Sequence, residues 1–144
     1  MRKHKGFTLI ELVVVVMILG ILAAVAAPKL LNTSASAADN GLKESLGVVR
    51  DAIERFAAEH AGQLPGTPAG TQAAFLTDIA PYIRGNFPKC PVAGQNSNIA
   101  INTAAAPLTP AGAQSWMYST ADGTFICNNS GNTKSDPSVT YNSL

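Results

Sequence analysis

Apolar residues are distributed very unevenly along the chain. Residues 7–27 contain only two polar side chains, those of Thr8 and Glu11, and the stretch from Leu12 to Ala27 contains none. A helix of this length spans roughly 30 Å, the thickness of the hydrocarbon core of a bilayer. The pattern therefore predicts a membrane-spanning helix near the N-terminus.

A second helical pattern follows, from about Leu30 to Ala61. Within it, large apolar residues recur at spacings of three and four positions and form one face: Leu42, Leu46, Val49, Ile53 and Phe56. Three oppositely charged pairs stand four positions apart on the more polar sides: Asp39 with Lys43, Arg50 with Glu54, and Asp51 with Arg55. This arrangement is typical of an amphipathic helix whose apolar face lies on a small core and whose other sides are solvated.

Pro28 lies between these two helical patterns. Proline lacks a backbone N–H and clashes with the carbonyl of the residue four positions earlier, here Ala24. A kink is therefore expected within one long helix, and Gly20 is a second weak position.

Turn-forming residues end the amphipathic helix. Residues 62–68 contain two glycines and two prolines and predict a loop. A short helix is expected over Gln72–Ala80, and the prolines around Cys90 predict an extended strap over residues 87–91.

Three later segments alternate well enough to be strands: residues 98–103, 115–119 and 124–128. The dipeptide Asp122-Gly123 between the last two is a hairpin signal. We expect a small antiparallel sheet whose aromatic side chains pack on the apolar face of the helix, with these candidates: Trp116, Tyr118 and Phe125. The sequence therefore predicts an α+β fold in which a long N-terminal helix packs on a small C-terminal antiparallel sheet.

The last segment, residues 129–144, is polar and rich in Ser and Asn, and we expect a surface loop or a disordered tail there. The whole chain of 144 residues suffices for one domain of modest size. The predicted division is an N-terminal segment 1–6, a membrane helix 7–28, and a head 29–144 that includes the tail.

Charge is nearly balanced, with a formal net charge of +1. Its basic part is concentrated at Arg2, Lys3 and Lys5, and residues 7–144 carry seven basic against nine acidic side chains. Nucleic-acid binding requires a basic face that this chain lacks, so no nucleic-acid partner is expected.

Cys90 and Cys127 are the only cysteines. Neither belongs to a CxxC pair or lies near a histidine, so metal binding and thiol redox chemistry are poorly supported. A structural disulfide between them would close a loop of nearly forty residues and stabilise the domain by roughly 4 kcal/mol. The alternative is two unpaired, buried cysteines.

The N-terminal segment admits three interpretations. A secretory signal explains the basic start and the small residues near Ala27, but the apolar stretch is longer than usual and Glu11 lies at its start. A simple anchor, with its basic N-terminus in the cytoplasm, leaves Glu11 unexplained. The third interpretation supplies a partner for this acid, since a carboxylate in a membrane helix costs a few kcal/mol unless it is paired.

The string Gly6-Phe7-Thr8-Leu9-Ile10-Glu11 resembles the processing site of the type IV pilins and type II secretion pseudopilins. The resemblance implies that a prepilin peptidase cuts between Gly6 and Phe7 and that the amine of Phe7 is methylated. Residues 1–6 would then be the prepilin leader. It also implies that Glu11 and Pro28 serve assembly of the filament.

The spacing gives Glu11 a physical role. On a helix it lies about 6 Å, or one turn, beyond the amine that cleavage at Phe7 creates. A neighbouring subunit displaced along the filament axis could place its own amine beside this carboxylate. Each charge would neutralise the other in an apolar environment, and the pair would set the register between subunits.

The same resemblance implies further partners and a location. These are identical or related pilin subunits in a helical filament, an inner-membrane assembly platform and its ATPase. The chain would lie in the bacterial inner membrane, N-terminus cytoplasmic and head outside, before it enters a periplasmic or extracellular filament. The major pseudopilins also carry calcium, but the C-terminal loops offer only Asp122 and Asp136, so no metal or cofactor site is assigned here. The cysteine pair is similar to the disulfide loop of many type IV pilins.

The functional hypothesis is thus a structural pilin or pseudopilin subunit. A minor pilin or tip adhesin is an alternative, as is, with less support, a secreted soluble protein with a cleaved signal. An enzyme is not expected because the chain has no GxSxG, no metal-spaced histidine cluster and no phosphate-binding glycine loop. Glu54 and Glu59 could be called paired acids, but we interpret them as solvated charges on a helix.

Overall fold

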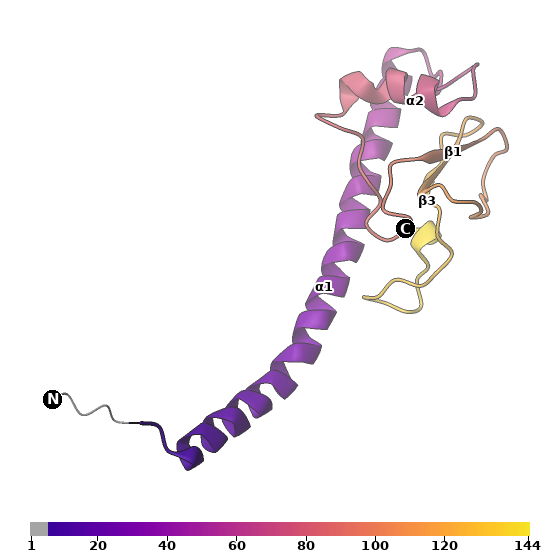
Figure 1. The fold of residues 1–144 in the computed structure, drawn as a ribbon. Coiled ribbons are helices and arrows are strands. Elements are labelled where there is room, and N and C mark those ends of the chain that lie inside the picture. The colour runs from indigo at the N-terminus through magenta and orange to yellow at the C-terminus, as the bar shows by residue number, and fades with distance from the viewer. Residues whose placement is uncertain (1–5) are drawn as a thin grey trace. The chain divides into compact units, whose positions relative to one another are not determined.

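The computed structural model describes residues 6–144 and has an α+β fold (Figure 1). The predicted long N-terminal helix is present as α1, which runs through 51 residues from Leu9 to Glu59. The remaining elements are α2 (Gln72–Ile79), the 3₁₀ turn η1 (Ala80–Tyr82), β1 (Ile99–Asn102), β2 (Trp116–Ser119), β3 (Phe125–Cys127) and the 3₁₀ turn η2 (Tyr141–Ser143). The predicted short helix and three strands are confirmed within one or two residues. The basic residues Arg2, Lys3 and Lys5 lie outside the described residues.

Pro28 lies inside α1, and the residues on both sides of it, including Gly20, are helical. Its missing N–H therefore does not end the helix. The chain divides into two compact units between Ala35 and Ser36. The division expected at residue 28 remains a prediction, and the two units are described separately.

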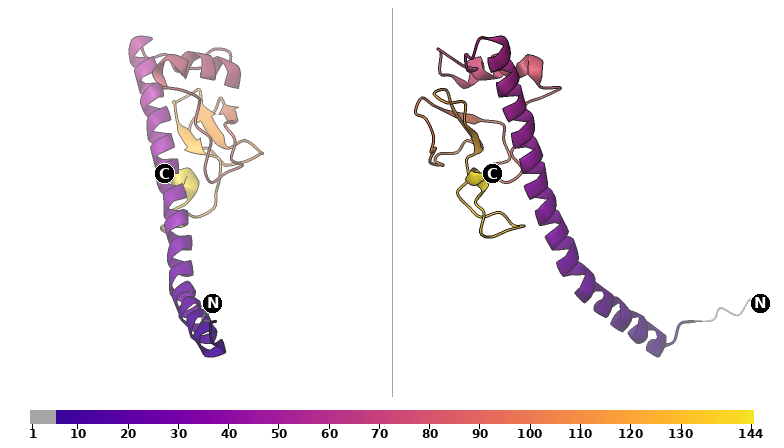
Figure 2. Two further views of the ribbon diagram at one scale, coloured as in Figure 1. Left: turned by 60° about the vertical axis from the view of Figure 1, so that its left-hand side comes forward. Right: turned by 180° about the vertical axis from the view of Figure 1, so that it is seen from behind.

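The core of the second unit forms on the predicted face of α1. Leu42, Leu46 and Val49 are almost completely buried, and Ile53 and Phe56 are less than a tenth exposed. The same core contains Trp116, Tyr118 and Phe125 from the sheet and Phe75 from α2. Both views in Figure 2 show the sheet and the C-terminal segment beside the C-terminal half of α1. The aromatic packing predicted from the sequence is confirmed.

The sheet is mixed, not wholly antiparallel as the sequence suggested. Its strand order is β1-β2-β3. The hairpin at Asp122-Gly123 does join β2 and β3 in antiparallel fashion, but β1 pairs with β2 in parallel. The physical reason is the connection over residues 103–115. It is long enough to bring the chain back to the end of the sheet at which β1 begins, as a parallel pair requires.

This connection also covers the outer face of the sheet. Leu108 is 7% exposed and packs with Met117 and Ile126 in a second, smaller apolar cluster. The Asn128 side chain holds the connection in place, because its amide accepts a hydrogen bond from the Ala111 N–H and donates one to the Ala111 carbonyl, each at 2.8 Å.

Residues 129–144, expected to be a surface loop or a disordered tail, form a mostly exposed loop that is called the C-terminal lobe here. A β-bridge joins Asn132 to Thr140, and Tyr141 is 5% exposed. The segment is thus a surface loop, and what the sequence did not predict is how it is attached to α1. Its backbone and its single tyrosine bind side chains of α1.

Asp39 and Arg50 are those side chains. They were expected on the more polar sides of α1, but the structure places both against the head. Asp39 is fully buried and accepts hydrogen bonds from the Ser135 N–H (2.6 Å) and the Tyr141 hydroxyl (3.0 Å). Arg50 is half-buried and donates to the main-chain oxygen of Leu144 at 2.6 Å. Both charges thus face the head, where each has hydrogen-bond partners that burial requires.

Candidate functional site

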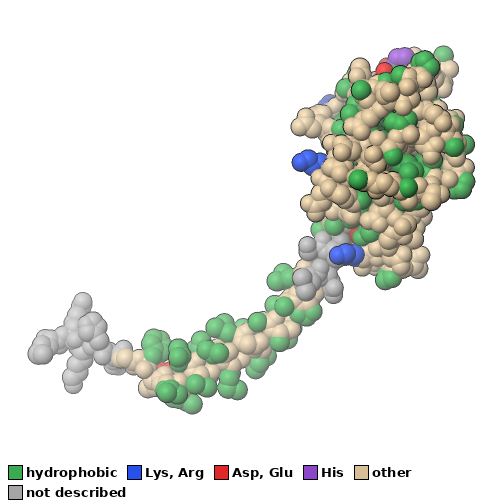
Figure 3. All heavy atoms as spheres, turned by 45° about the vertical axis from the view of Figure 1, so that its right-hand side comes forward, with side chains coloured by type: hydrophobic (Ala, Val, Ile, Leu, Met, Phe, Trp, Pro, Cys, Tyr) green, Lys and Arg blue, Asp and Glu red, His purple; other side chains and the backbone are tan. Residues whose placement is uncertain are grey.

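The first half of α1 is exposed and apolar on every side (Figure 3). Leu9–Leu30 is long and apolar enough to cross a membrane, with a mean hydropathy of 3.0, and none of it is buried within the molecule. An exposed apolar surface of this size is typical of a segment that contacts lipid or other protein.

Glu11 has a partner within its own chain at the start of this surface. Its Oε2 accepts hydrogen bonds from the Thr8 N–H (2.8 Å) and the Thr8 hydroxyl (2.7 Å). The Thr8 hydroxyl in turn accepts from the Glu11 N–H at 3.3 Å, and the Thr8 carbonyl accepts from the Leu12 N–H. This is a capping box, in which two of the unpaired N–H groups of the first helical turn are satisfied reciprocally.

The predicted cleavage site lies directly before this cap. Gly6 and Phe7 have no regular secondary structure, and the Phe7 side chain is 86% exposed. A peptidase needs an accessible segment outside regular structure, and Gly6 and Phe7, which flank the predicted scissile bond, are exposed and outside α1. The roles assigned to Gly6, Phe7, Glu11 and Pro28 remain predictions.

The structure brings the two cysteines together in the core of the head. Cys90 lies in the extended strap, and Cys127 ends β3. Both are fully buried, and their sulfur atoms lie 3.6 Å apart as free thiols. The hydrogen bond from Cys127 lowers the pKa of the Cys90 thiol to about 7, whereas the same contact and burial raise the pKa of Cys127. The pair is placed for a disulfide, and the bond itself remains a prediction.

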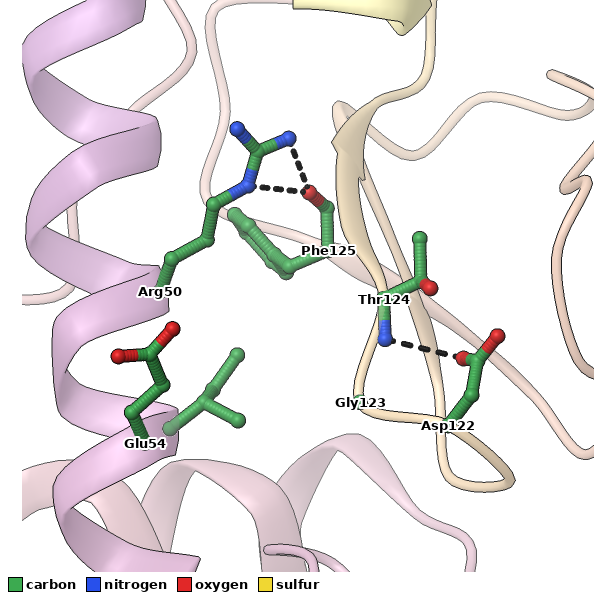
Figure 4. A pocket seen from close by; sticks show the side chains of 7 residues that line it. Arg50, Glu54, Asp122, Gly123, Thr124 and Phe125 are labelled. Atoms are coloured by element: carbon green, nitrogen blue, oxygen red, sulfur yellow. Dashed lines mark hydrogen bonds between the residues drawn. The ribbon is translucent and has the colours of Figure 1, made fainter.

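A cavity of about 380 Å³ lies between α1 and the β2–β3 hairpin (Figure 4). Arg50, Glu54 and Asp122 line it, so its charges are mixed. Arg50 points to the Phe125 carbonyl, to which it donates from Nε at 3.1 Å and from Nη2 at 2.8 Å. Burial lowers the pKa of Arg50. The guanidinium binds a main-chain oxygen on the free edge of β3 and serves the fold.

The acids of the C-terminal loops are occupied by local hydrogen bonds. Asp122 accepts from the Ala106 N–H (2.7 Å) and the Thr124 N–H (3.0 Å), and these bonds lower its pKa. Asp136 accepts from the hydroxyl and the N–H of Ser138, which lower its pKa. Within the part of the chain that the structure describes, no three His, Cys, Asp or Glu side chains form a group that could hold a metal ion.

Sequence reasoning missed three residues that matter here. The capping role of Thr8 could have been predicted, because Thr-x-x-Glu directly before an apolar run is the sequence signature of a capping box. Asp39 offered a weaker signal, since it stands three positions before Leu42 and so belongs to the core face of α1. The contacts of Arg50 had no local signal, because both acceptors lie at least 75 positions away in the sequence.

Comparison with known proteins agrees with the N-terminal motif. Residues 1–27 match the family model of the prokaryotic N-terminal methylation motif. The chain is 47% identical over 62 residues to the fimbrial protein EcpB of Eikenella corrodens. It is 29% identical over 89 residues to the type II secretion system core protein G of Klebsiella pneumoniae, and 50% identical over 51 residues to the type IV major fimbrial protein FimA of Dichelobacter nodosus.

These matches are partial. They cover 43%, 62% and 35% of this chain, and 38%, 63% and 33% of EcpB, core protein G and FimA respectively. No solved structure shows a significant match to the chain. The relatives are type IV fimbrial proteins and core proteins of type II secretion, and similarity to core protein G extends over more residues than α1 contains.

Proposed function

We propose that this homologue of type IV fimbrial proteins and type II secretion core proteins G is a structural subunit of a type IV pilus or a type II secretion pseudopilus. The observation that carries the proposal is the methylation motif of residues 1–27 at the start of an exposed, membrane-length helix. A structural role needs a polymerising surface and no reaction centre. The relatives named above are likewise fimbrial or secretion proteins.

Processing is the first step of the proposed function. The chain enters the inner membrane with its N-terminus in the cytoplasm and its head outside. A prepilin peptidase then cleaves between Gly6 and Phe7, and the new amine of Phe7 is methylated. An assembly platform and its ATPase move the processed subunit into the filament, where it contacts other copies through α1.

Glu11 controls register in this proposal. Its carboxylate exchanges the intramolecular donors of Thr8 for the processed Phe7 amine of a neighbouring subunit. The capping box holds the acid in one orientation before assembly, which reduces the cost of an unpaired charge in lipid. The charged amine is a stronger partner than two neutral donors, so docking of the neighbour is favoured.

Two variants separate helix capping from charge pairing. Glu11→Gln keeps an oxygen that accepts from Thr8 but loses the negative charge, whereas Thr8→Val loses the capping hydroxyl and keeps the charge. We expect Glu11→Gln to insert into membranes normally and to reduce filament yield at least tenfold, and Thr8→Val to have a much smaller effect. The measurement is the yield of sheared filaments relative to membrane-bound subunit, and a normal yield from Glu11→Gln would contradict the register role.

Mass spectrometry of the mature protein tests the processing step. The expected N-terminus is a methylated Phe7, and an N-terminus near Pro28 would instead indicate a secretory signal. The same measurement tests the proposed Cys90–Cys127 disulfide, because the bond removes two hydrogen atoms from the mass. Genes for a secretion ATPase together with a secretin beside the subunit gene would favour a pseudopilus, and genes for a retraction ATPase together with adhesins would favour a pilus.

A further inference from the structure

The Cys90–Cys127 pair is enclosed by parts of the chain that are distant in sequence. Both side chains have no exposed surface, and the core cluster around them includes Tyr141 of the C-terminal lobe. The lobe follows β3 directly, and the turn η2 that contains Tyr141 packs against that strand. A reagent in solvent therefore reaches the two sulfur atoms only after part of the head moves.

The lobe is the part of this enclosure that is attached by few groups. Its large apolar anchors are Tyr141, which is buried, and Leu144, which is partly buried. The other attachments are hydrogen bonds. Two reach the Asp39 carboxylate and one comes from the Arg50 guanidinium, both on α1, and a fourth runs from the Asn129 amide to the Val92 carbonyl. Segments held by few apolar contacts open locally at a lower free energy than the whole domain unfolds.

Asp39 joins two points of the lobe that are six positions apart. One carboxylate oxygen binds the Ser135 N–H and the other binds the Tyr141 hydroxyl, and the acid itself is fully buried. Removal of this carboxylate would leave a partly buried N–H and a buried hydroxyl without their acceptor, which disfavours the docked lobe.

We propose that the C-terminal lobe is a lid over the Cys90–Cys127 pair, latched by Asp39, and that the pair undergoes thiol–disulfide exchange only while the lobe is undocked. This inference rests on the ability of the pair to form the disulfide proposed above. It does not depend on assembly of the chain into a filament.

The exchange needs a small disulfide as the oxidant. With the lid open, the Cys90 thiolate attacks one sulfur of that disulfide, releases the other half as a thiolate and forms a mixed disulfide. Cys127, 3.6 Å away, then loses its proton and attacks the Cys90 sulfur, which releases the second half. The protein loses two protons and two electrons, and the oxidant becomes two thiols. The two thiols can exchange roles in this scheme, because either sulfur can donate the hydrogen bond between them.

Two consequences follow for the life of the molecule. A newly translocated chain would form the bond before or while the lobe docks. After docking, reductants of the same chemical class would be excluded from the bond. The lid would therefore fix the redox state of the head at the time of folding.

The experiment measures thiol access in the full chain. The reduced protein in a nonionic detergent is mixed with dithiodipyridine, a disulfide whose thione product absorbs light. We expect the native wild type to react at least a hundredfold more slowly than the same protein in guanidinium chloride. Asp39→Ala should react at least tenfold faster than native wild type, and Tyr141→Phe, which loses only the hydroxyl, should lie between them.

Controls separate lid opening from loss of the fold. Glu44→Ala removes an exposed acid from the same helix, five positions after Asp39, and should react like the wild type. Emission of Trp116, the only tryptophan, reports whether the core is intact. Trypsin should cut Asp39→Ala after Lys134 in the lobe before it cuts after Arg50 in α1.

Three results would overturn the proposal. The first is a native wild type that reacts as fast as the denatured protein. The second is an Asp39→Ala protein with native Trp116 emission and the wild-type rate. If Asp39→Ala does not fold, Tyr141→Phe decides, and an unchanged rate in that variant would be the third. The same proteins can be tested for filament yield, so failure of the lid and failure of the filament role are distinguishable.

Discussion

Replacement of Arg50 by methionine tests how the head is held on α1. The guanidinium donates to two main-chain oxygens, those of Phe125 and Leu144, through three hydrogen bonds of 3.1, 2.8 and 2.6 Å. Methionine keeps most of the aliphatic stem and removes all three donors. The substitution therefore separates the hydrogen bonds of Arg50 from its packing.

The burial of Arg50 sets the expected loss in the free energy of unfolding. A hydrogen bond to a charged group contributes about 1.5–3 kcal/mol net when it is buried. Arg50 is only half-buried, so water can reach the two acceptors in part and the contribution of each falls to about 1–1.5 kcal/mol. We expect Arg50→Met to lower the free energy of unfolding of the head by about 2–3 kcal/mol.

Urea unfolding of the full chain in nonionic detergent, followed by Trp116 emission, measures this loss. With a typical dependence of about 1–3 kcal/mol per molar urea, the midpoint should fall by about 1 M or more. Glu54→Gln is the matched control on the same helix, and a solvated pair four positions apart contributes only about 0.3–0.5 kcal/mol. If Arg50→Met costs less than about 0.5 kcal/mol, as Glu54→Gln should, Arg50 is a surface charge and the reasoning is refuted.

Two further predictions concern buried polar groups. Burial alone would raise the pKa of Asp39, but the hydrogen bonds from Ser135 and Tyr141 outweigh it, so the pKa is lowered. The stability that Asp39 adds over Asp39→Asn should therefore be complete above the unfolded pKa of about 3.9 and shrink as pH falls below it. Urea unfolding at about pH 7 and about pH 3 measures this, and an equal difference at both values would contradict it. The Tyr118 hydroxyl is buried without a hydrogen-bond partner among the described residues, so Tyr118→Phe should cost less than about 0.5 kcal/mol or stabilise the head. A loss above about 1 kcal/mol would show that this hydroxyl is paired.

Local patterns predicted the elements of the fold well. The face of α1 from Leu42 to Phe56, the hairpin at Asp122-Gly123 and the aromatic core depend on periodicity and turn chemistry within a few residues. The parallel pairing of β1 was missed because the direction of a strand depends on the path of a long connection, which leaves no periodic signal.

For the candidate site, too, the features set by neighbouring residues could be predicted and those set by distant contacts could not. Gly6, Phe7 and Glu11 form a contiguous motif, and Thr8 completes a capping box that four consecutive residues specify. The attachment of the lobe was missed for the opposite reason. Its polar residues carry no local sign of these contacts, and the acid that binds them, Asp39, lies 96 positions before Ser135.

The sequence by itself determined that this chain has an apolar, membrane-length helix with a processing motif, an amphipathic continuation and a small head, because each depends on neighbouring residues. Only the tertiary structure decided what three charged or reactive groups do. It buried Asp39 beneath the lobe, joined Arg50 to the free edge of β3, and placed the sulfur atoms of Cys90 and Cys127 3.6 Å apart. These contacts join segments that are far apart in the chain, and they form only when the core brings those segments together.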